Sequence, residues 1–316
     1  MVSIVMATYE PNPSHFLAAL DSALSQTWSK IEVIIRDDSQ TEIVKQIVDT
    51  QTDNRIRYRK NRESLGTASN HWQAFKEARG EFIAILNHDD LFDSRFVISL
   101  LSSLLKDPEA VVAFCDHWII DNHGTIQIDA SDDASHSYGR SKLQAGIHRP
   151  FGTLLLNQTI PMAMGSMFRR AALPSRLPID CGPAYDLWLT YYLVRTGHGA
   201  VYIPERLSSW RCHPASITSS GSLPWLAGSA SCWRAVAADP LMLAHRKKAK
   251  RKAAEGFVRC GLTSWRENNP RSTAHFAIQS IRIRPNMRAF AVLVFSFLPH
   301  FLVKKLFLFF RTSREV

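Results

Sequence analysis

The sequence has few cysteines and no paired cysteine motif. The five cysteines lie at positions 115, 181, 212, 232 and 260, each far from the others. A C-x-x-C pair marks most zinc ribbons and thiol redox centres, so this spacing argues against both kinds of site. Isolated thiols in odd number are typical of proteins from a reducing compartment, and we expect all five to be reduced.

Long apolar runs are also scarce. Before the last thirty residues of the 316, no run reaches the roughly 20 residues that span a bilayer, which excludes a polytopic membrane protein. Residues 1–7 contain no basic stretch ahead of an apolar one, so we expect no secretory signal peptide. With 46% hydrophobic and 21% charged residues, the composition indicates a globular protein of one large or two smaller domains.

Glycine-rich phosphate loops are missing as well. No G-x-G-x-x-G follows the first apolar segment, and no G-x-x-x-x-G-K-[S/T] occurs anywhere, which excludes the usual dinucleotide and P-loop sites. Short apolar segments instead alternate with amphipathic ones, and this alternation predicts an α/β sheet with helices on both faces. The expected strands are 2–7, 31–35, 56–58, 82–86, 111–115 and 200–204; the expected helices are one after Ser14 as its cap, then 42–51, 67–79, 94–106 and 184–194.

Three of these strands end in polar or acidic residues, namely at 8–10, at 37–38 and at 89–90. In wound α/β sheets, ligands bind at the carboxyl ends of the strands. Asp89 and Asp90 would repel each other unless a divalent cation neutralised them, so the pair favours Mg²⁺ or Mn²⁺ bridging to phosphate. The alternative is a solvated turn that caps helix 94–106. One carboxylate of the pair Asp37 and Asp38 could bind a base or ribose, or could cap the helix near 42.

Two candidates lie further along the chain. Asp186 starts helix 184–194 among large apolar residues, where burial would raise its pKa and suit it to act as a general base. The alternative is an acidic residue placed there by the helix dipole. Arg211 and His213 follow a strand and could bind phosphate and a metal ion, although a lone histidine is more often structural.

Taken in order, these segments resemble the family 2 glycosyltransferases, which are inverting enzymes with the GT-A fold. The similarity extends to about residue 218. It rests on the strand and Thr-Tyr loop at 2–9, S-Q-T-W at 25–28, the strand ending in D-D-S at 31–39, Asn61 with L-G-T-A and Asn70, the strand ending in N-H-D-D at 80–90, Y-D-L-W-L at 185–189, and Y-I-P-E with W-R-C-H-P at 202–205 and 210–214.

The resemblance implies a GT-A type doubly wound mixed sheet and a nucleoside-diphosphate sugar as donor. It implies Asp186 as the catalytic base and Mn²⁺ or Mg²⁺ on Asp90, with Asp89 and His213 beside it. The nucleotide-sugar site would contain Thr8, Tyr9, Glu10, Asp38, Asn61, Gly66, Asn70, Asp89 and Arg211. Two positions depart from the family pattern, because Asn87 stands where many relatives have Asp and Glu10 replaces a frequent Asn. We therefore expect a donor-binding half at 1–110, an acceptor-binding half with the base at 111–220, and a helical, basic region at 221–316.

The positive charge is concentrated at the end of the chain. Residues 241–316 hold 16 Lys and Arg against 3 Asp and Glu, although the whole chain carries only +10. The segment 289–310 is strongly apolar, but Pro299-His300 and Lys304-Lys305 make spanning unfavourable. An amphipathic segment in the interface of an anionic membrane fits better. The alternative is that it packs on the catalytic domain or on a second subunit, which would form a homodimer.

These observations favour an inverting glycosyltransferase that acts on a lipid-linked glycan in surface polysaccharide or O-antigen synthesis, as many bacterial relatives do. We expect it at the inner face of the cell membrane, with a hexose or deoxyhexose carried on UDP, dTDP or GDP. A metal-dependent nucleotidyltransferase would need a basic, glycine-rich loop after the first strand, and residues 8–11 are not one. A non-enzymatic membrane or nucleic-acid protein would leave the acidic motifs unexplained, so we expect no nucleic-acid partner.

Overall fold

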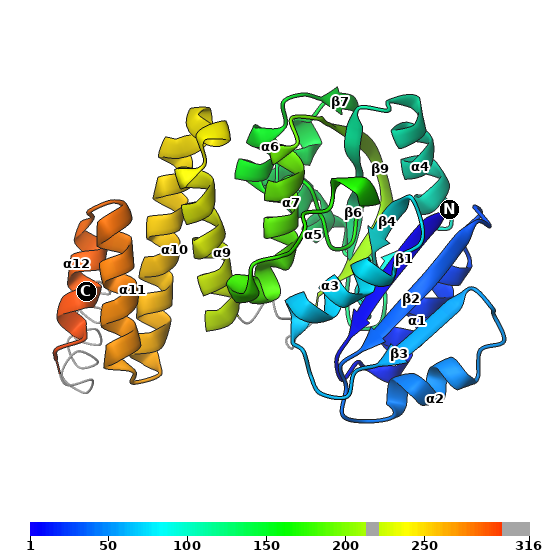
Figure 1. Cartoon of the computed structure of the whole chain (residues 1–316), viewed down its shortest axis with the longest axis horizontal. Coiled ribbons are helices and arrows are strands. Elements are labelled where there is room, and N and C mark those ends of the chain that lie inside the picture. Colours follow the sequence, from blue (N-terminus) through cyan, green and yellow to red (C-terminus); the bar gives the residue numbers. More distant parts are fainter. Residues whose placement is uncertain (213–220, 299–316) are drawn as a thin grey trace. The chain divides into compact units, whose positions relative to one another are not determined.

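The computed structural model describes residues 1–212 and 221–298, which fall into two compact units, one on each side of the gap. The first unit is a mixed α/β sheet with helices on both faces, and the second is helical (Figure 1). The predicted fold class is therefore confirmed.

The first half of the sheet is parallel. The strands β1 (Val2–Thr8), β2 (Ile31–Asp37), β3 (Ile56–Lys60) and β4 (Phe82–Ile85) alternate with α1 (Pro13–Leu24), α2 (Ile43–Asp49) and α3 (Thr67–Glu77). β1 pairs with β2 and β4, and β2 pairs with β3, all in parallel register. Every residue of β2 is buried, as expected for an apolar strand covered on both faces. The carboxyl ends of β1, β2 and β4 consequently meet at one edge.

The second half of the sheet contains strands of both directions. β8 (Ser166–Arg169) runs antiparallel to β4 on one side and to β6 (Ala110–Ile120) on the other. β9 (Gly199–Arg211) pairs in parallel with β6, and it also pairs antiparallel with the short strands β5 (Leu91–Phe92) and β7 (Gly146–His148). The remaining elements are α4 (Phe96–Lys106), α5 (Ile128–Ser137), η1 (Arg140–Lys142), α6 (Gly152–Asn157), η2 (Arg170–Ala172), η3 (Ile179–Ala184) and α7 (Tyr185–Arg195).

The two faces of the sheet are covered by different helices. Phe16 and Leu20 of α1 and Leu100 of α4 pack with Ile4 and Met6 of β1 in one buried apolar cluster. On the other face, α3 packs on β1 and β2, and its Phe75 meets Phe168 of β8 edge to face. Burial of these side chains removes them from water, which is the main force that holds the helices on the sheet.

Some local expectations were wrong. Ser14 does not cap α1: the Asn12 side chain accepts hydrogen bonds from the N–H groups of Ser14 and His15, and Pro13 takes the first helical position, where its missing N–H is not needed. β6 and β9 also continue well past the predicted strands 111–115 and 200–204. Their second halves contain buried polar residues such as His117 and Ser208, which hides them from an apolar pattern.

The second unit consists of α9 (Leu223–Ala238), η4 (Pro240–His245), α10 (Arg246–Arg266), α11 (Pro270–Ile283) and α12 (Met287–Phe295). α10 packs against α9 and α11, and Val258, Ala277, Ala289 and Val292 form a small shared core. A Cβ atom on Gly261 would lie 2.7 Å from a methyl group of Val292, so glycine permits this close approach. Within the ranges described, no helix combines the length and apolar character needed to cross a membrane. The apolar segment begins with α12, and its part from residue 299 lies outside the described residues.

Candidate active site

Asp38 is the centre of a hydrogen-bond network at the edge where β1 and β2 end. Its carboxylate accepts hydrogen bonds from the Asn61 side-chain amide at 2.7 Å and from the Ser64 hydroxyl at 3.0 Å. It also accepts from the main-chain N–H groups of Leu65 at 2.9 Å and of Gly66 at 2.8 Å. The alternative role of Asp38 as a cap for α2 is wrong, because the start of α2 has no side-chain cap. Asp38 instead holds the 64–66 loop against the sheet edge.

The network continues through two asparagines. Asn61 also donates to the side-chain oxygen of Asn70 at 2.8 Å, and Asn70 donates to the carbonyl of Thr8 at 3.3 Å. Asp38 N–H donates to the same carbonyl at 2.9 Å. Gly66 has a φ of 76°, a region that favours glycine, and this turn aims its N–H at Asp38. The structure thus brings together five of the predicted nucleotide-site residues, namely Thr8, Asp38, Asn61, Gly66 and Asn70.

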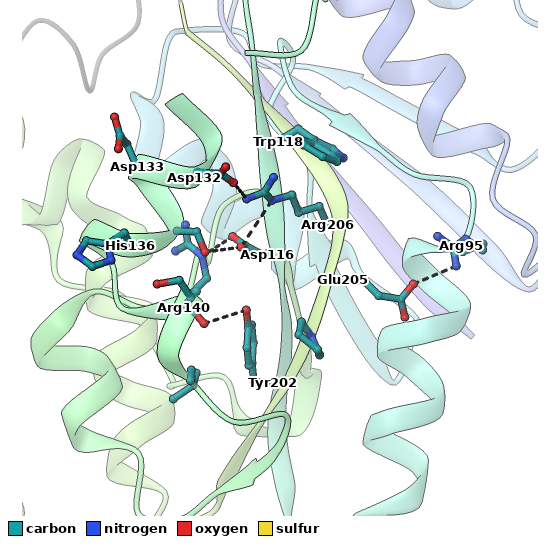
Figure 2. A pocket seen from close by; sticks show the side chains of 14 residues that line it. Arg95, Asp116, Trp118, Asp132, Asp133, His136, Arg140, Tyr202, Glu205 and Arg206 are labelled. Carbon is teal, nitrogen blue, oxygen red and sulfur yellow. Dashed lines mark hydrogen bonds and ion pairs between the residues drawn. The ribbon is translucent and has the colours of Figure 1, made fainter. Parts of the chain in front are cut away.

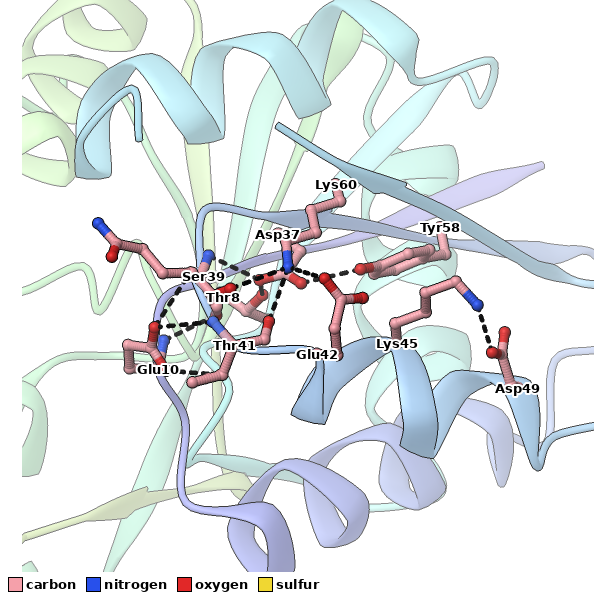
Figure 3. Close-up of polar contacts among 11 residues, drawn as sticks. Thr8, Glu10, Asp37, Ser39, Thr41, Glu42, Lys45, Asp49, Tyr58 and Lys60 are labelled. Atoms are coloured by element: carbon pink, nitrogen blue, oxygen red, sulfur yellow. Dashed lines mark hydrogen bonds and ion pairs between the residues drawn. The ribbon is translucent and has the colours of Figure 1, made fainter. Parts of the chain in front are cut away.

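Glu10 joins the loop after β1 to the loop after β2 (Figure 3). Its carboxylate accepts hydrogen bonds from the Thr41 hydroxyl at 2.7 Å and from the N–H of Gln40 at 2.8 Å, and the Thr41 bond is the main cause of a lowered pKa of Glu10. Its own N–H donates to the Ser39 hydroxyl at 2.8 Å. Tyr9, the residue before it, is 56% exposed and presents its ring at the surface.

Asp37 has a structural role that the sequence did not reveal. The carboxylate is fully buried and accepts hydrogen bonds from the Thr8 hydroxyl at 3.2 Å, the Tyr58 hydroxyl at 2.9 Å and the Ser39 N–H at 2.9 Å (Figure 3). Burial, followed by this hydrogen bond to Asp37, raises the pKa of Tyr58 well above its usual value. Of the two adjacent acids, Asp37 therefore fixes the strand ends, and Asp38 faces the loop.

The Asp89–Asp90 turn follows β4 at the same edge. Asp90 is fully buried, and its two carboxylate oxygens accept hydrogen bonds from Arg211 N–H and from the Asn87 side chain, each at 2.9 Å. Burial, and then the nearby charge of Asp89, raise the pKa of Asp90 above its usual value. Asn87, one of the two departures from the family pattern, thus supplies a donor where a third carboxylate would add repulsion. Asp89 is the partly exposed member of the pair.

Arg211 holds this turn in place. The side chain is only 3% exposed, and its guanidinium donates to the carbonyls of Asp89 at 2.8 Å and of Asp121 at 3.0 Å. The alternative role of the acidic pair as a cap for α4 is wrong, because the N–H of Val97 donates to Gln26 instead. A phosphate contact of Arg211 stays a prediction, and His213 lies outside the described residues.

Asp186 lies in the first turn of α7 and is partly buried. Its carboxylate accepts a hydrogen bond from Leu187 N–H at 2.8 Å, yet burial raises its pKa to about 6. The preceding Tyr185 stacks on His71 of α3 with ring centroids 4.0 Å apart. Apart from burial, the charges of Asp186 and Asp90 both raise the pKa of Tyr185, which puts the start of α7 beside the acidic turn.

Comparison with known proteins identifies the family. The model of glycosyl transferase family 2 matches residues 3–174, more than half of the chain. The chain belongs to this family. The resemblance seen in the sequence is therefore confirmed.

Relatives of this glycosyltransferase include curated bacterial proteins. The Escherichia coli UDP-Glc:alpha-D-GlcNAc-diphosphoundecaprenol beta-1,3-glucosyltransferase WfgD is 30% identical over 221 residues, or 70% of this chain and 80% of WfgD. The uncharacterized glycosyltransferase RT0329 of Rickettsia typhi is 26% identical over 222 residues, 70% of this chain and 66% of its own length. A second Escherichia coli enzyme named for the same activity, WfaP, is 41% identical over 90 residues, but the match spans only 28% of this chain and 36% of WfaP.

The glycosyltransferase fold is also seen in solved structures. Staphylococcus aureus TarS 1–349 in complex with UDP-GlcNAc superposes with a TM-score of 0.66 at 15% identity, covering 92% of this chain and 83% of that structure. A mannosyltransferase from Pyrobaculum calidifontis, in complex with GDP-Man and Mn²⁺, gives a TM-score of 0.59 at 17% identity. The match covers 93% of this chain and 78% of that structure. At these identities the likeness establishes the GT-A type fold.

The residues of this glycosyltransferase can be tested against the metal that the family implies. In the part of the chain that the structure covers, no three His, Cys, Asp or Glu side chains form a metal cluster. The donor chemistry of Asp89–Asp90 nevertheless fits, because hard carboxylate oxygens suit Mg²⁺ or Mn²⁺ and a nearby cation would favour the ionised form of buried Asp90.

Sequence reasoning missed one residue that shapes the site. Gln26 is buried, and its amide donates to the carbonyls of Ser22 and Asp93, both at 2.9 Å, while its oxygen accepts from Val97 N–H at 2.9 Å. It thus ties the end of α1 to the start of α4, just after the acidic turn. The S-Q-T-W motif contained this residue, but no local pattern shows a partner 71 positions away.

Proposed function

We propose that this glycosyltransferase moves a sugar, with inversion, from a nucleoside-diphosphate sugar to a hydroxyl of a lipid-linked glycan. The observation that carries the proposal is the meeting of three features at one sheet edge: the Asp38 network, the Asp89–Asp90 turn, and a carboxyl at the start of α7 whose pKa is raised to about 6. This combination would supply a nucleotide site, a site for developing charge and a base.

The donor site that we propose is built on the two loops that Glu10 joins. Tyr9 would stack on the base with its exposed ring, and Asp38 would position the 64–66 loop beside the base. WfgD and WfaP are named for UDP-glucose, and the TarS structure contains UDP-GlcNAc. These names support a UDP-sugar as the donor.

In the proposed reaction, Asp186 removes the proton from the acceptor hydroxyl as that oxygen attacks the anomeric carbon from the face opposite the departing diphosphate. A base works best when its pKa lies near the working pH, and burial has brought Asp186 close to that range. Asp89 and Asp90 would hold Mg²⁺ or Mn²⁺, which would neutralise the charge that grows on the diphosphate. Arg211 and Asn87 hold the Asp90 carboxylate in position before the donor arrives, and Arg211 also holds the main-chain carbonyl of Asp89.

We further propose that the second unit binds the cytoplasmic membrane surface, where a lipid-linked acceptor would lie. Large apolar side chains are exposed on α12 and just after it. They are Met287 at 83%, Phe290 at 46% and Val294 at 54% in the helix, and Phe297 at 78% two residues beyond its end. The surrounding sequence is strongly basic, which favours anionic lipid. WfgD and WfaP are named for a diphosphoundecaprenol-linked acceptor, which supports this placement.

Thermal unfolding with UDP, dTDP, GDP and CMP, each with and without Mn²⁺, tests the donor site. A nucleotide at a hundred times its Kd stabilises the protein by about 2.7 kcal/mol, which is easily measured. We expect one nucleoside diphosphate to raise the melting temperature in a Mn²⁺-dependent way, and Asp90→Asn to abolish that dependence. The proposal would be refuted by a protein that no nucleotide stabilises.

A further inference from the structure

The first unit contains a cavity that none of the predicted site residues lines. It has a volume of about 770 Å³, within the range of small-molecule sites. Its walls come from β6 and β9, from α5 with the turn at 140–142, and from Arg95 at the start of α4 (Figure 2). The cavity thus lies on the strands of the second half of the sheet.

The same two strands lead to the acidic turn. Asp116 of β6 pairs with Arg206 of β9 beside the cavity, and Ile120 pairs with Arg211 at the turn. Five residues of strand separate Arg206 from Arg211, which at about 3.3 Å per residue is roughly 16 Å. That separation suits a chain of several linked sugars more closely than it suits a single substrate molecule.

A buried ion pair forms the floor of the cavity. Arg140 is 2% exposed and donates from Nε to Asp116 at 2.6 Å, and the Ser135 hydroxyl donates to the other oxygen of Asp116 at 2.6 Å. The Nη2 group of Arg140, however, is buried without a hydrogen-bond partner in the described residues. A buried N–H group without an acceptor is costly even when the guanidinium is ion-paired, so this atom points to a ligand that supplies an oxygen acceptor.

The cations of the cavity are already balanced by carboxylates. Arg140 pairs with Asp116, Arg206 with Asp132 at 2.5 Å, and Arg95 with Glu205 at 3.0 Å (Figure 2). No positive charge is therefore left over for a phosphate or a nucleotide. The paired groups still offer alternating donors and acceptors, which match the hydroxyl groups of a neutral sugar.

Aromatic rings complete the walls. Trp118 is two residues from Asp116 in β6, faces the same side of the strand and is partly exposed. One face of its ring is covered by the Arg206 guanidinium, 4.4 Å from the ring centroid. Tyr202 lies across the cavity, and its hydroxyl donates to the Arg140 carbonyl at 3.4 Å. Rings that combine an apolar body with fixed polar neighbours suit the C–H faces and hydroxyl edges of a sugar.

We infer that this cavity holds a neutral sugar residue of the acceptor glycan, remote from the sugar that receives the transferred unit. The inference rests on the proposed function and adds a specificity site to it. Binding of a remote part of the acceptor positions its reactive hydroxyl and selects among glycans of different length and sequence.

The test compares Asp132→Ala and Trp118→Ala with Asp129→Ala, an equally exposed acid on α5 that does not line the cavity. Each full-length variant, labelled and without donor, is applied to an array of immobilised bacterial glycans. Asp132→Ala removes a charged hydrogen-bond acceptor and Trp118→Ala removes an aromatic ring from the cavity. Each change should weaken glycan binding by about 10- to 100-fold. Asp129→Ala should bind like the wild type, and melting temperatures show that each variant is folded.

The outcomes separate this inference from the proposed function. If UDP and Mn²⁺ stabilise the protein but it binds no array glycan, or if both cavity variants bind glycans as well as the wild type, the inference is wrong and the transferase proposal stands. If no nucleotide binds at all, the transferase proposal itself fails. Asp132→Ala keeps the test valid if Trp118→Ala does not fold, because Asp132 is on the surface.

Discussion

At the scale of single residues, Asp186 carries the strongest chemical consequence. Burial raises its pKa to about 6, so the ionised base is lost as the pH falls through that value. We expect kcat/KM to fall about tenfold for each pH unit below about pH 6, because a single carboxylate must be ionised.

Asp186→Asn should lower turnover by about 10²- to 10⁴-fold while leaving the affinity for the nucleoside diphosphate unchanged. Steady-state kinetics across pH 5 to 8, with Asp129→Asn as control, measure both effects. An equal loss of nucleotide affinity would contradict the role.

The same shift predicts a cost in stability. Because the pKa of Asp186 is raised on folding, the folded state holds this proton more tightly, and ionisation destabilises it as the pH rises from about 4 to 6. Asp186→Asn should therefore be more stable than the wild type at pH 7.5, by up to about 3 kcal/mol before solvent screening, and nearly equal to it at pH 4. Urea denaturation at the two pH values provides the measurement. If Asp186→Asn is less stable than the wild type at pH 7.5, burial of the ionised Asp186 carboxylate does not destabilise the folded protein.

The family resemblance, more than any local pattern, named Thr8, Asp38, Asn61, Gly66 and Asn70. The structure gathers these five residues in one network, and their contact with a nucleotide stays a prediction. The sequence could not show that Asp38 bonds to main-chain N–H groups, because those depend on the path of the 64–66 loop. It also gave no sign of the pair Arg140–Asp116, whose members are 24 positions apart and join only when α5 folds onto β6.

At the scale of elements, one side chain replaces the missing cap of α4. Arg95, at the cap position, makes no side-chain capping bond, and Gln26 accepts from Val97 N–H instead. Gln26→Ala would leave this N–H without its acceptor and would remove one hydrogen bond from each of the Ser22 and Asp93 carbonyls. We expect a loss of about 1–3 kcal/mol in the free energy of unfolding, measured by urea denaturation.

Gln46→Ala is the matched control, because Gln46 is an exposed residue of α2. It should change the stability by less than about 0.5 kcal/mol. If Gln26→Ala and Gln46→Ala have equal free energies of unfolding, the Gln26 link between α1 and α4 does not stabilise the protein.

Elements with regular apolar patterns were predicted best. The parallel strands β1, β2 and β4 are buried on both faces and read as apolar runs. The long strands β6 and β9 were predicted too short, because their register shifts after Cys115, where Asp116 pairs with Arg206 rather than with the residue after Ile203. A bulge of this kind breaks the period of two on which a sequence pattern depends.

At the scale of the whole molecule, the exposed apolar side chains of the second unit predict membrane binding. Phe290→Ser with Phe297→Ser should weaken binding to vesicles that contain phosphatidylglycerol by at least tenfold, because each ring loses its burial in lipid. Binding of the wild type should also weaken as salt screens the basic residues. Vesicle flotation measures both effects.

Leu105→Ser provides the control for this experiment. Leu105 is 57% exposed and belongs to α4 of the first unit, so its loss should leave vesicle binding unchanged. A double variant that floats with vesicles as well as the wild type does would remove α12 from the proposed membrane contact.

The reversed strand β8 has a consequence for how such a protein evolves. β6 and β9, which line the cavity described above, pair with none of β1, β2 and β4, because β8 lies between β4 and β6. Mutations that reshape the cavity leave the hydrogen-bond register of the nucleotide loops untouched. Under the proposed function, a lineage could inherit one donor chemistry unchanged and still change the acceptor glycan that it recognises, one cavity substitution at a time.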